Sequence, residues 1–250
     1  MNMPEDNYAA DPASEAWDDR TRRVLGEEAV ERLADASVLI VGVGGVGGYA
    51  AEMLVRSGVG KLTLIDADKV AESNINRQII ALRSTVGMPK SIIAAERLHD
   101  INPAASIDCL QMYLDPAQVD EILDAEFDFV LDCIDTVAPK AALLTRCLLR
   151  RVPVISSMGA GGRIDPTKVC YSDIWSTRDD GLARAVRHHL KKNGVRRSLM
   201  TVCSTEPVRK QSLMEINDTN KRTSYGSLAA IPSIFGIYMA NYVIRKIGKV

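Results

Sequence analysis

Short apolar runs and amphipathic stretches alternate along most of the chain. Runs short enough for buried strands occur at 38–41, 61–66, 106–111, 127–132 and 152–156. Helical spacing of apolar residues occurs at 27–34, 46–57, 90–100, 116–123 and 138–150, with Pro116 at an allowed first helical position. This order predicts an α/β fold with a Rossmann-like, doubly wound, mostly parallel sheet through about residue 157.

The pattern changes after the glycine-rich segment 159–162. Strands predicted at 168–174 and 199–204 flank a basic helical stretch at 182–192, and an apolar helix at 228–247 closes this C-terminal strand and helix extension. Because segment 228–244 contains Pro232, Ser233 and Asn241, we interpret it as a buried helix and expect no membrane span. We expect a disordered acidic tail at 1–16 and one domain over 17–250. That domain divides into a nucleotide-binding half, 17–157, and a substrate and dimer half, 158–250.

Composition fits one large α/β domain, and charge is distributed unevenly along it. The chain has 250 residues, 46% of them hydrophobic, and a formal net charge of −1. Residues 178–222 nevertheless carry eleven Lys or Arg against five acids, a net of +6. This region is either a polyanion-binding surface or a solvated helix face, and the sequence leaves both open.

The five cysteines are scattered and form no Cys-x-x-Cys pair. A four-cysteine zinc site is therefore not expected. An odd number of separate cysteines suits a reducing compartment, and the polar, acidic N-terminus does not resemble a signal peptide. We expect a cytoplasmic protein.

A glycine-rich turn follows the first predicted strand. Bare backbone at this position lets a phosphate approach the start of the next helix, whose N-terminus favours negative charge. The second strand ends at Asp66, 24 residues after the first of these glycines, about where a ribose-binding acid is placed in dinucleotide folds. Alone, these features would suggest NAD or an unliganded turn. The glycines are Gly42, Gly44, Gly45 and Gly47.

Three further polar residues favour ATP over NAD. Asn74, Arg77 and Lys90 follow the glycine turn and could converge on phosphates, since Arg offers a planar fork and Lys a point charge. Each alone would be an ordinary surface residue. Asp135 follows the fourth strand, at the sheet edge where open α/β folds bind ligands. It is either a carboxylate for Mg²⁺ bridging phosphate oxygens or an N-cap or turn residue before the next helix.

Together these motifs resemble the adenylating family of ubiquitin-activating enzymes and the bacterial ThiF/MoeB group. The matching residues are Gly42-x-Gly-Gly-x-Gly47, Asp66-x-Asp68, Asn74-x-x-Arg-Gln78, Pro89-Lys90 and Asp132-x-x-Asp135. The resemblance implies that a substrate carboxylate attacks the α-phosphate of ATP–Mg²⁺, pyrophosphate leaves, and a nucleophile then displaces AMP.

The resemblance also implies roles for individual residues. Asp66 would hold the ribose, and Asp135 would bind Mg²⁺. Arg23 would reach the ATP of the neighbouring subunit, so we expect a homodimer, with the apolar 231–244 segment offering surface for a two-fold interface. The implied catalytic residues are Arg77, Lys90, Asp135 and Arg23. The implied nucleotide-binding residues are Gly42, Gly44, Gly45, Gly47, Asp66, Asp68, Asn74, Arg77, Gln78 and Lys90.

Departures from the family pattern select a branch. Sulfur-carrier adenylyltransferases of the group usually carry two Cys-x-x-Cys pairs for zinc, which this chain lacks, so we expect no zinc. The segments 138–143 and 159–167 are similar to the tRNA threonylcarbamoyladenosine dehydratases. That branch implies activation of the threonylcarbamoyl carboxylate beside the tRNA anticodon, followed by cyclisation with net loss of water. The residues we expect to contact tRNA are Arg184, Arg187, Lys191 and Lys192.

Two other functions and one thiol stay open at this point. One alternative is a sulfur-carrier adenylyltransferase acting on a ubiquitin-like protein tail. The other is a non-catalytic NAD-binding module, which would leave Arg77 and Lys90 unexplained. Cys203 is either a buried strand thiol or a group with a redox role, in which case a sulfur-transfer protein would be a partner.

Overall fold

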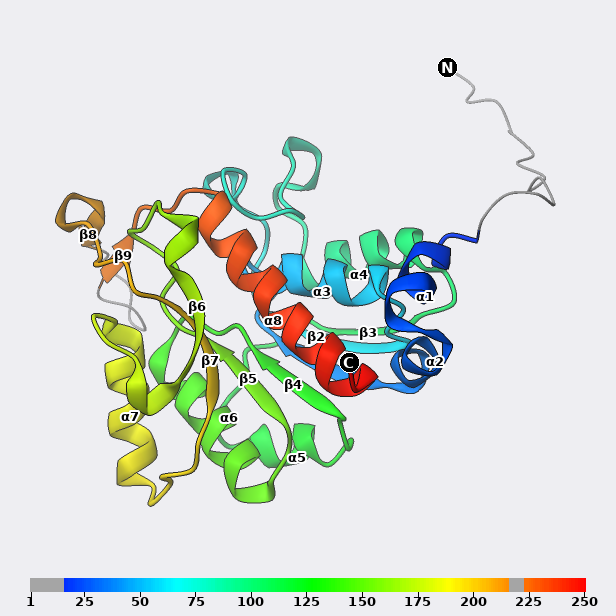
Figure 1. The fold of residues 1–250 in the computed structure, drawn as a ribbon. Helices are drawn as coiled ribbons and strands as arrows, with labels where there is room; N and C mark the ends of the chain where they lie inside the picture. Colours follow the sequence, from blue (N-terminus) through cyan, green and yellow to red (C-terminus); the bar gives the residue numbers. More distant parts are fainter. Residues whose placement is uncertain (1–15, 216–222) are drawn as a thin grey trace.

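The computed structural model describes residues 16–215 and 223–250 as a three-layer α/β fold (Figure 1). Its helices are α1 (Asp19–Leu25), α2 (Glu27–Asp35), α3 (Gly47–Arg56), α4 (Lys90–Ile101), α5 (Val119–Leu123), α6 (Val137–Arg150), α7 (Gly181–Lys192) and α8 (Ala230–Gly248). Its strands are β1 (Ser37–Val41), β2 (Lys61–Ile65), β3 (Ser106–Leu110), β4 (Phe129–Asp132), β5 (Val154–Ser157), β6 (Val169–Asp173), β7 (Met200–Ser204), β8 (Leu213–Glu215) and β9 (Thr223–Tyr225).

The main sheet confirms the predicted doubly wound topology. Its strand order is β3-β2-β1-β4-β5-β7-β6, and every neighbouring pair is parallel except the antiparallel pair β6 and β7. The chain moves outward from β1 to β3 and then returns to the other side of β1 with β4. In open α/β sheets a crevice forms at the carboxyl ends of the strands where this reversal occurs. The topology therefore places a binding crevice beside the ends of β1 and β4.

Helices cover both faces of the sheet, as the alternation of residues in β1 requires. Val38 and Ile40 belong to the apolar cluster that contains α3, α4 and α8, whereas Leu39 and Val41 face α5 and α6. A third cluster joins α6 to α7 beneath the last strands. These layers bury both sides of every central strand, which explains why the strand sequences are almost wholly apolar.

Helix α8 runs diagonally across one face of the sheet (Figure 1). Ile231, Phe235, Met239 and Val243 recur every four residues and are fully buried. At Gly236 an added Cβ would lie 2.3 Å from the carbonyl oxygen of Val46, so α8 packs directly against the start of α3. The interpretation of this segment as a buried core helix is confirmed. None of the helices in 16–215 and 223–250 combines the length and apolarity that a bilayer crossing needs.

The packing of 231–244 limits the surface that this segment offers to a second subunit. Its residues Ile231, Phe235, Met239 and Val243 fill the core of their own chain. Ile237 is 41% exposed, and Ile234, Tyr238 and Tyr242 are half-buried. The two-fold interface on this segment, and the dimer itself, stay predictions.

Local differences from the predicted elements have local causes. Helix α5 begins at Val119 instead of Pro116, because the Asp115 carboxylate accepts the Ala117 N–H at 2.8 Å and fixes a turn there. Helix α1 and the β8–β9 hairpin were not predicted. The expected acidic tail at 1–16 lies outside the described residues apart from Ala16.

Candidate active site

A cleft of about 680 Å³ opens along the carboxyl ends of β1, β2, β4 and β5. The cleft brings together most of the site residues that the sequence predicts. Those lining it are Gly42, Gly44, Gly45, Asp66, Asp68, Arg77, Gln78, Lys90 and Asp135. Gly47, Asn74, Arg23 and the basic residues of α7 lie outside the lining.

The glycine turn is shaped by close backbone contacts. Gly42 has φ +90°, and an added Cβ would lie 2.9 Å from the Cys133 carbonyl oxygen. At Gly47 an added Cβ would lie 1.8 Å from the Gly42 carbonyl oxygen, so this glycine allows α3 to start against the end of β1. Gly44 instead lines the cleft, and an added Cβ there would meet only the Gln78 side chain, with Nε2 at 3.6 Å. Gly42 and Gly47 thus build the turn, and Gly44 leaves room for a ligand.

Asp66 joins the end of β2 to this turn. Its carboxylate accepts the Val43 N–H at 2.7 Å and the Asp68 N–H at 2.8 Å. Burial raises the pKa of Asp66, while the nearby Lys90 charge and the two backbone N–H groups oppose the rise. A carboxylate has about four acceptor positions. Those left over at Asp66 suit the ribose hydroxyls that the sequence assigned to it.

Two cations and an amide line the cleft. Lys90 is buried, and its Nζ lies 2.6 Å from an oxygen of the exposed Asp68. Arg77 donates to the Ser73 carbonyl and to Asn76 Oδ1, both at 2.8 Å. Gln78 Oε1 is buried with no hydrogen-bond partner within the described part of the chain. Cations with one face on the cleft and an unused acceptor are what a bound polar ligand would engage.

Asn74 does not line the cleft, and its side chain makes a hydrogen bond within its own segment. Its Oδ1 accepts the Ala71 N–H at 3.1 Å, and the side chain is buried in the single turn Glu72–Asn74. The turn leads directly to Arg77 and Gln78. Asn74 therefore supports the segment that carries them, and its contact with a phosphate stays a prediction.

A buried ion pair positions the loop that carries Asp135. Asp132 and Lys140 are both fully buried, with Lys140 Nζ 2.8 Å from Asp132 Oδ2. Ser156 Oγ donates to the same oxygen at 2.6 Å, and Lys140 also donates to the Ile134 carbonyl at 2.9 Å. Burial raises the pKa of Asp132, and Lys140 lowers it. The network ties the loop after β4 to β5 and α6.

Asp135 itself is exposed and lines the cleft. The N-cap of α6 is Thr136, so the reading of Asp135 as the helix cap does not apply. Within residues 16–215 and 223–250, no group of three or more His, Cys, Asp or Glu side chains could hold a metal ion alone. A single carboxylate fits Mg²⁺ held jointly by protein and substrate phosphates, which is its usual manner of binding in nucleotide enzymes.

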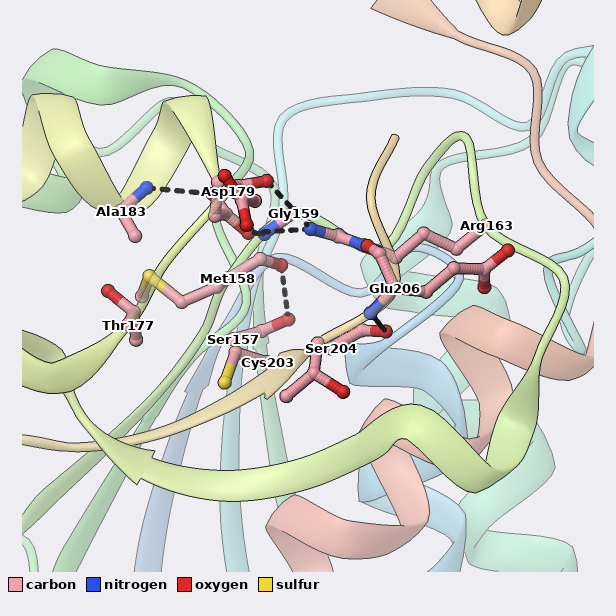
Figure 2. A network of polar contacts seen from close by, with 12 residues as sticks. Ser157, Met158, Gly159, Arg163, Thr177, Asp179, Ala183, Cys203, Ser204 and Glu206 are labelled. Atoms are coloured by element: carbon pink, nitrogen blue, oxygen red, sulfur yellow. Dashed lines mark hydrogen bonds and ion pairs between the residues drawn. The ribbon is translucent and has the colours of Figure 1, made fainter. Parts of the chain in front are cut away.

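Sequence reasoning missed Arg163 as a cleft residue. It lies in the loop after β5, is 2% exposed and lines the cleft. Figure 2 shows its side chain reaching from its own loop toward Gly159 and Asp179. A signal was present, because the loop follows a parallel strand at the same sheet edge as Asp66 and Asp135.

The cysteines near the cleft are poor nucleophiles. Cys203 lies in β7 opposite Cys170, with the two sulfurs 3.9 Å apart. Burial raises the pKa of Cys203 to about 12, and burial also raises the pKa of Cys133. Both are therefore protonated near neutral pH, and a protonated thiol is a weak nucleophile. The reading of Cys203 as a buried strand thiol is favoured.

The basic residues of α7 divide into exposed and tethered groups. Arg184, Lys191 and Lys192 are exposed, and Lys191 lies 5.7 Å from the centre of the Trp175 ring. Arg187 instead donates to the carbonyls of Ile174 and Thr177, at 3.1 and 3.2 Å. Arg187 thus holds the segment before α7. A contact between Arg187 and tRNA stays a prediction. It has less support than the others, because these hydrogen bonds restrict the Arg187 side chain.

Arg23 lies on α1, outside the cleft of its own chain. Figure 1 shows α1 at one end of the molecule and α7 with the β8–β9 hairpin at the other. Trp17 and Val24, close to Arg23 in sequence, are 56% and 82% exposed. The geometry leaves open the predicted role of Arg23 in a neighbouring subunit.

Comparison with known proteins adds family membership to this geometry. The tRNA threonylcarbamoyladenosine dehydratase of Bacillus subtilis is 38% identical over 238 residues, covering 92% of this chain and 94% of the relative. Solved structures of the Escherichia coli tRNA N6-threonylcarbamoyladenosine dehydratase, TcdA, in complex with ATP and with AMP superpose with TM-scores of 0.85 and 0.84. They share 36% and 35% identity and cover 94% and 95% of this chain and 96% and 97% of those chains.

A second kind of relative is similar over only part of the chain. The Escherichia coli molybdopterin-synthase adenylyltransferase is 43% identical over 135 residues, covering 54% of this chain and 53% of that protein. The family model that describes the ThiF family matches residues 19–250 of this chain. The chain therefore belongs to the ThiF family.

Proposed function

We propose that this chain is an ATP-dependent tRNA threonylcarbamoyladenosine dehydratase. The observation that carries the proposal is one cleft lined by the glycine turn, Asp66, Arg77, Lys90 and Asp135, in a chain similar over nearly its whole length to dehydratases of that name. The candidate residues for ribose, for part of the phosphate contacts and for the metal all line this cleft. The reaction adenylates the threonylcarbamoyl carboxylate in tRNA.

The residues of the cleft suit the first chemical step. Backbone at Gly44 and Gly45 and the cations Arg77 and Lys90 hold ATP. The α-phosphate then faces the part of the cleft beside the loop after β5, where the carboxylate substrate binds; we call this part the acceptor side. A carboxylate oxygen of the substrate attacks the α-phosphorus, and the bond to pyrophosphate breaks. No covalent enzyme intermediate is required, since alignment and charge neutralisation supply the catalysis.

The second step closes the ring. A nucleophilic atom of the same side chain attacks the acyl carbon, the bond to AMP breaks, and the nucleophile loses its proton. The carboxylate oxygen leaves with AMP, so the modified nucleoside has lost one water. Asp135 would hold Mg²⁺, which supplies neutralisation of phosphate charge when bound.

The remaining finer points belong to the same proposal. The enzyme works as a homodimer in which Arg23 serves the partner's cleft, and tRNA phosphates contact α7. Because all five cysteines are free, the chain suits the reducing cytoplasm. The burial of Cys203 offers no support for sulfur transfer or a sulfur-transfer partner.

The alternative function, adenylation of a ubiquitin-like protein tail, has one supporting observation. It is the similarity to molybdopterin-synthase adenylyltransferase, which is confined to about half of the chain. The absence of Cys-x-x-Cys pairs from the sequence weighs against it. The non-catalytic NAD module is weaker still, because Lys90 and Arg77 line the cleft without any role in binding NAD.

Mass spectrometry of tRNA tests the proposal. Purified protein is incubated with ATP, Mg²⁺ and tRNA that carries threonylcarbamoyladenosine. The expected result is loss of one water from the modified nucleoside, together with AMP and pyrophosphate. An unchanged nucleoside mass, with pyrophosphate exchange stimulated only by a protein ending in Gly-Gly, would support the alternative.

A further inference from the structure

The guanidinium of Arg163 is buried in the cleft wall, and its three nitrogens differ in their contacts. Its Nε donates to the Glu206 carbonyl at 3.0 Å, and its Nη2 lies 3.4 Å from Asp180 Oδ2. Nη1 is buried and has no hydrogen-bond partner within residues 16–215 and 223–250. A buried donor without a partner is unfavourable, and native proteins keep few of them. At the wall of a cleft, such a donor indicates a ligand oxygen.

The position of Arg163 along the sheet edge indicates which ligand this is. Strand β5 neighbours β4 on the side away from β1 and β2. In the proposed function, the ends of β2, β1 and β4 bind ribose, phosphates and metal in that order. The loop after β5 is next in the series, so Arg163 faces the reactant that approaches the α-phosphate. That reactant is the carboxylate substrate.

The charges around Arg163 favour an acyl oxygen over a polyphosphate. Asp180, 3% exposed, neutralises the guanidinium. Both oxygens of Asp180 are also fixed by backbone, one by the Gly159 N–H at 2.9 Å and the other by the Ala183 N–H at 2.8 Å. Arg163 therefore offers a rigid hydrogen-bond donor with little net positive charge, whereas Lys90 and Arg77 supply charge for phosphates.

We propose that Nη1 of Arg163 donates a hydrogen bond to the oxygen of the substrate carboxylate that does not attack phosphorus. The proposal rests on the proposed function. During adenylation this oxygen becomes the carbonyl oxygen of the acyl adenylate. During ring closure it receives the electron pair of the C=O bond, and the pair returns as the bond to AMP breaks and the nucleophile releases its proton. A preorganised donor at that oxygen lowers the barrier in both steps.

The test replaces Arg163 by Met, which keeps the length of the side chain and removes its donors. Pyrophosphate release and ring closure are followed in a single turnover with saturating ATP and saturating tRNA that carries threonylcarbamoyladenosine. The expected result is a rate on the order of 10²-fold lower or more. The affinities for ATP and for the same tRNA without the modification are expected to be unchanged. Arg97→Met is the matched control. It also removes an arginine that pairs with a buried carboxylate, here Glu52, but this pair lies outside the cleft.

The outcomes separate the alternatives. A folded Arg163→Met protein with a rate close to wild type would overturn the proposal. So would a parallel loss of ATP affinity, which would assign Nη1 to the nucleotide. If circular dichroism shows that Arg163→Met does not fold, Arg163→Lys is used in its place. This variant keeps a positive charge beside Asp180 and removes the planar donor pair. The same loss of single-turnover rate is expected. Failure of the proposed function is distinct, because the wild-type protein would then release no pyrophosphate with this tRNA.

Discussion

Lys90 combines burial, a cation and a place on the cleft wall. Its partner Asp68 is 70% exposed at the side chain, so Asp68 can be hydrated if Lys90 is removed. Lys90→Ala is therefore expected to leave the fold intact while turnover drops by on the order of 10²- to 10³-fold, because a charge-assisted phosphate contact is lost in the transition state. The measurement is AMP formation with modified tRNA. Lys69→Ala, an exposed neighbour outside the cleft, is the control, and wild-type activity in Lys90→Ala would remove Lys90 from the site.

Three of the predicted cleft residues share one property. Asp66 directly follows β2, Asp135 lies three residues after the end of β4, and Gly44 lies in the turn after β1, so chain position places all three at the sheet edge. Asn74 and Arg187 show the limit of this reasoning. Their residue types suit anions, but the backbone groups that they contact in the fold, near Ala71 and Thr177, could not be inferred from residue type.

At the scale of elements, the connection from β4 to α6 depends on the buried pair Asp132 and Lys140. Lys140→Met would leave Asp132 without its cation, so we expect a loss of about 3–5 kcal/mol in the free energy of unfolding. Burial without Lys140 favours the neutral acid and raises the pKa of Asp132 further, so the loss should be smaller at acidic pH than at neutral pH. Urea unfolding at both pH values measures this.

The double variant Lys140→Met with Asp132→Asn serves as the control for this pair. Removal of both charges is expected to recover a large part of the lost stability, because no unpaired charge stays buried. A single variant as stable as wild type would show that the pair contributes nothing to the loop.

Helix α7 carries the prediction about tRNA. Arg184, Lys191 and Lys192 are exposed, so we choose them for reversal to Glu and leave the tethered Arg187 unchanged. Each lost phosphate contact should flatten the salt dependence of tRNA binding by roughly 0.7 to 0.9 log units per log unit of salt. ATP affinity should stay constant. Binding titrations at several salt concentrations measure the slope.

A matched triple reversal at the end of α8, of Arg245, Lys246 and Lys249, controls for net charge, since these residues are also exposed. If both triple variants show the same slope as wild type, α7 is a solvated helix face. If both flatten it equally, the effect is one of overall charge and α7 is not the binding surface.

At the scale of the whole molecule, Arg23 is outside the cleft of its own chain, and its helix carries exposed Val24. We expect a homodimer by light scattering, retained in Arg23→Ala. If Arg23 acts across the interface, an Arg23→Ala subunit with an intact cleft receives the arginine of a Lys90→Ala partner. Arg23→Ala and Lys90→Ala should each have lowered activity when expressed alone. Co-expression of the two variants should then restore up to about a quarter of wild-type activity, since half the dimers are mixed and each has one complete site.

Two results would contradict this picture. A monomer at working concentration would exclude action across an interface. Mixed dimers that are isolated with two affinity tags and are still inactive would show that Arg23 does not serve the partner's cleft.

The sequence by itself determined the doubly wound topology and the nucleotide side of the cleft. Short apolar runs identify the strands, a spacing of three to four residues identifies the helices, and parallel strands joined through helices place their carboxyl ends at one edge. The glycine turn, Asp66 and Asp135 then converge without any knowledge of packing, because each position follows from one strand and the rule for its end.

Only the tertiary structure decided the acceptor side and the role of α8. Arg163 acquires its environment from Asp180 and Glu206, which are 17 and 43 residues further along the chain, and its unused nitrogen depends on all three segments meeting. The apolar pattern of α8 likewise shows that a face is buried, and only the packing of Gly236 on Val46 shows that the partner is α3 of the same chain. The physical reason is common to both: a sequence pattern reports the polarity of a residue's surroundings, whereas the identity of a distant neighbour depends on how whole elements pack.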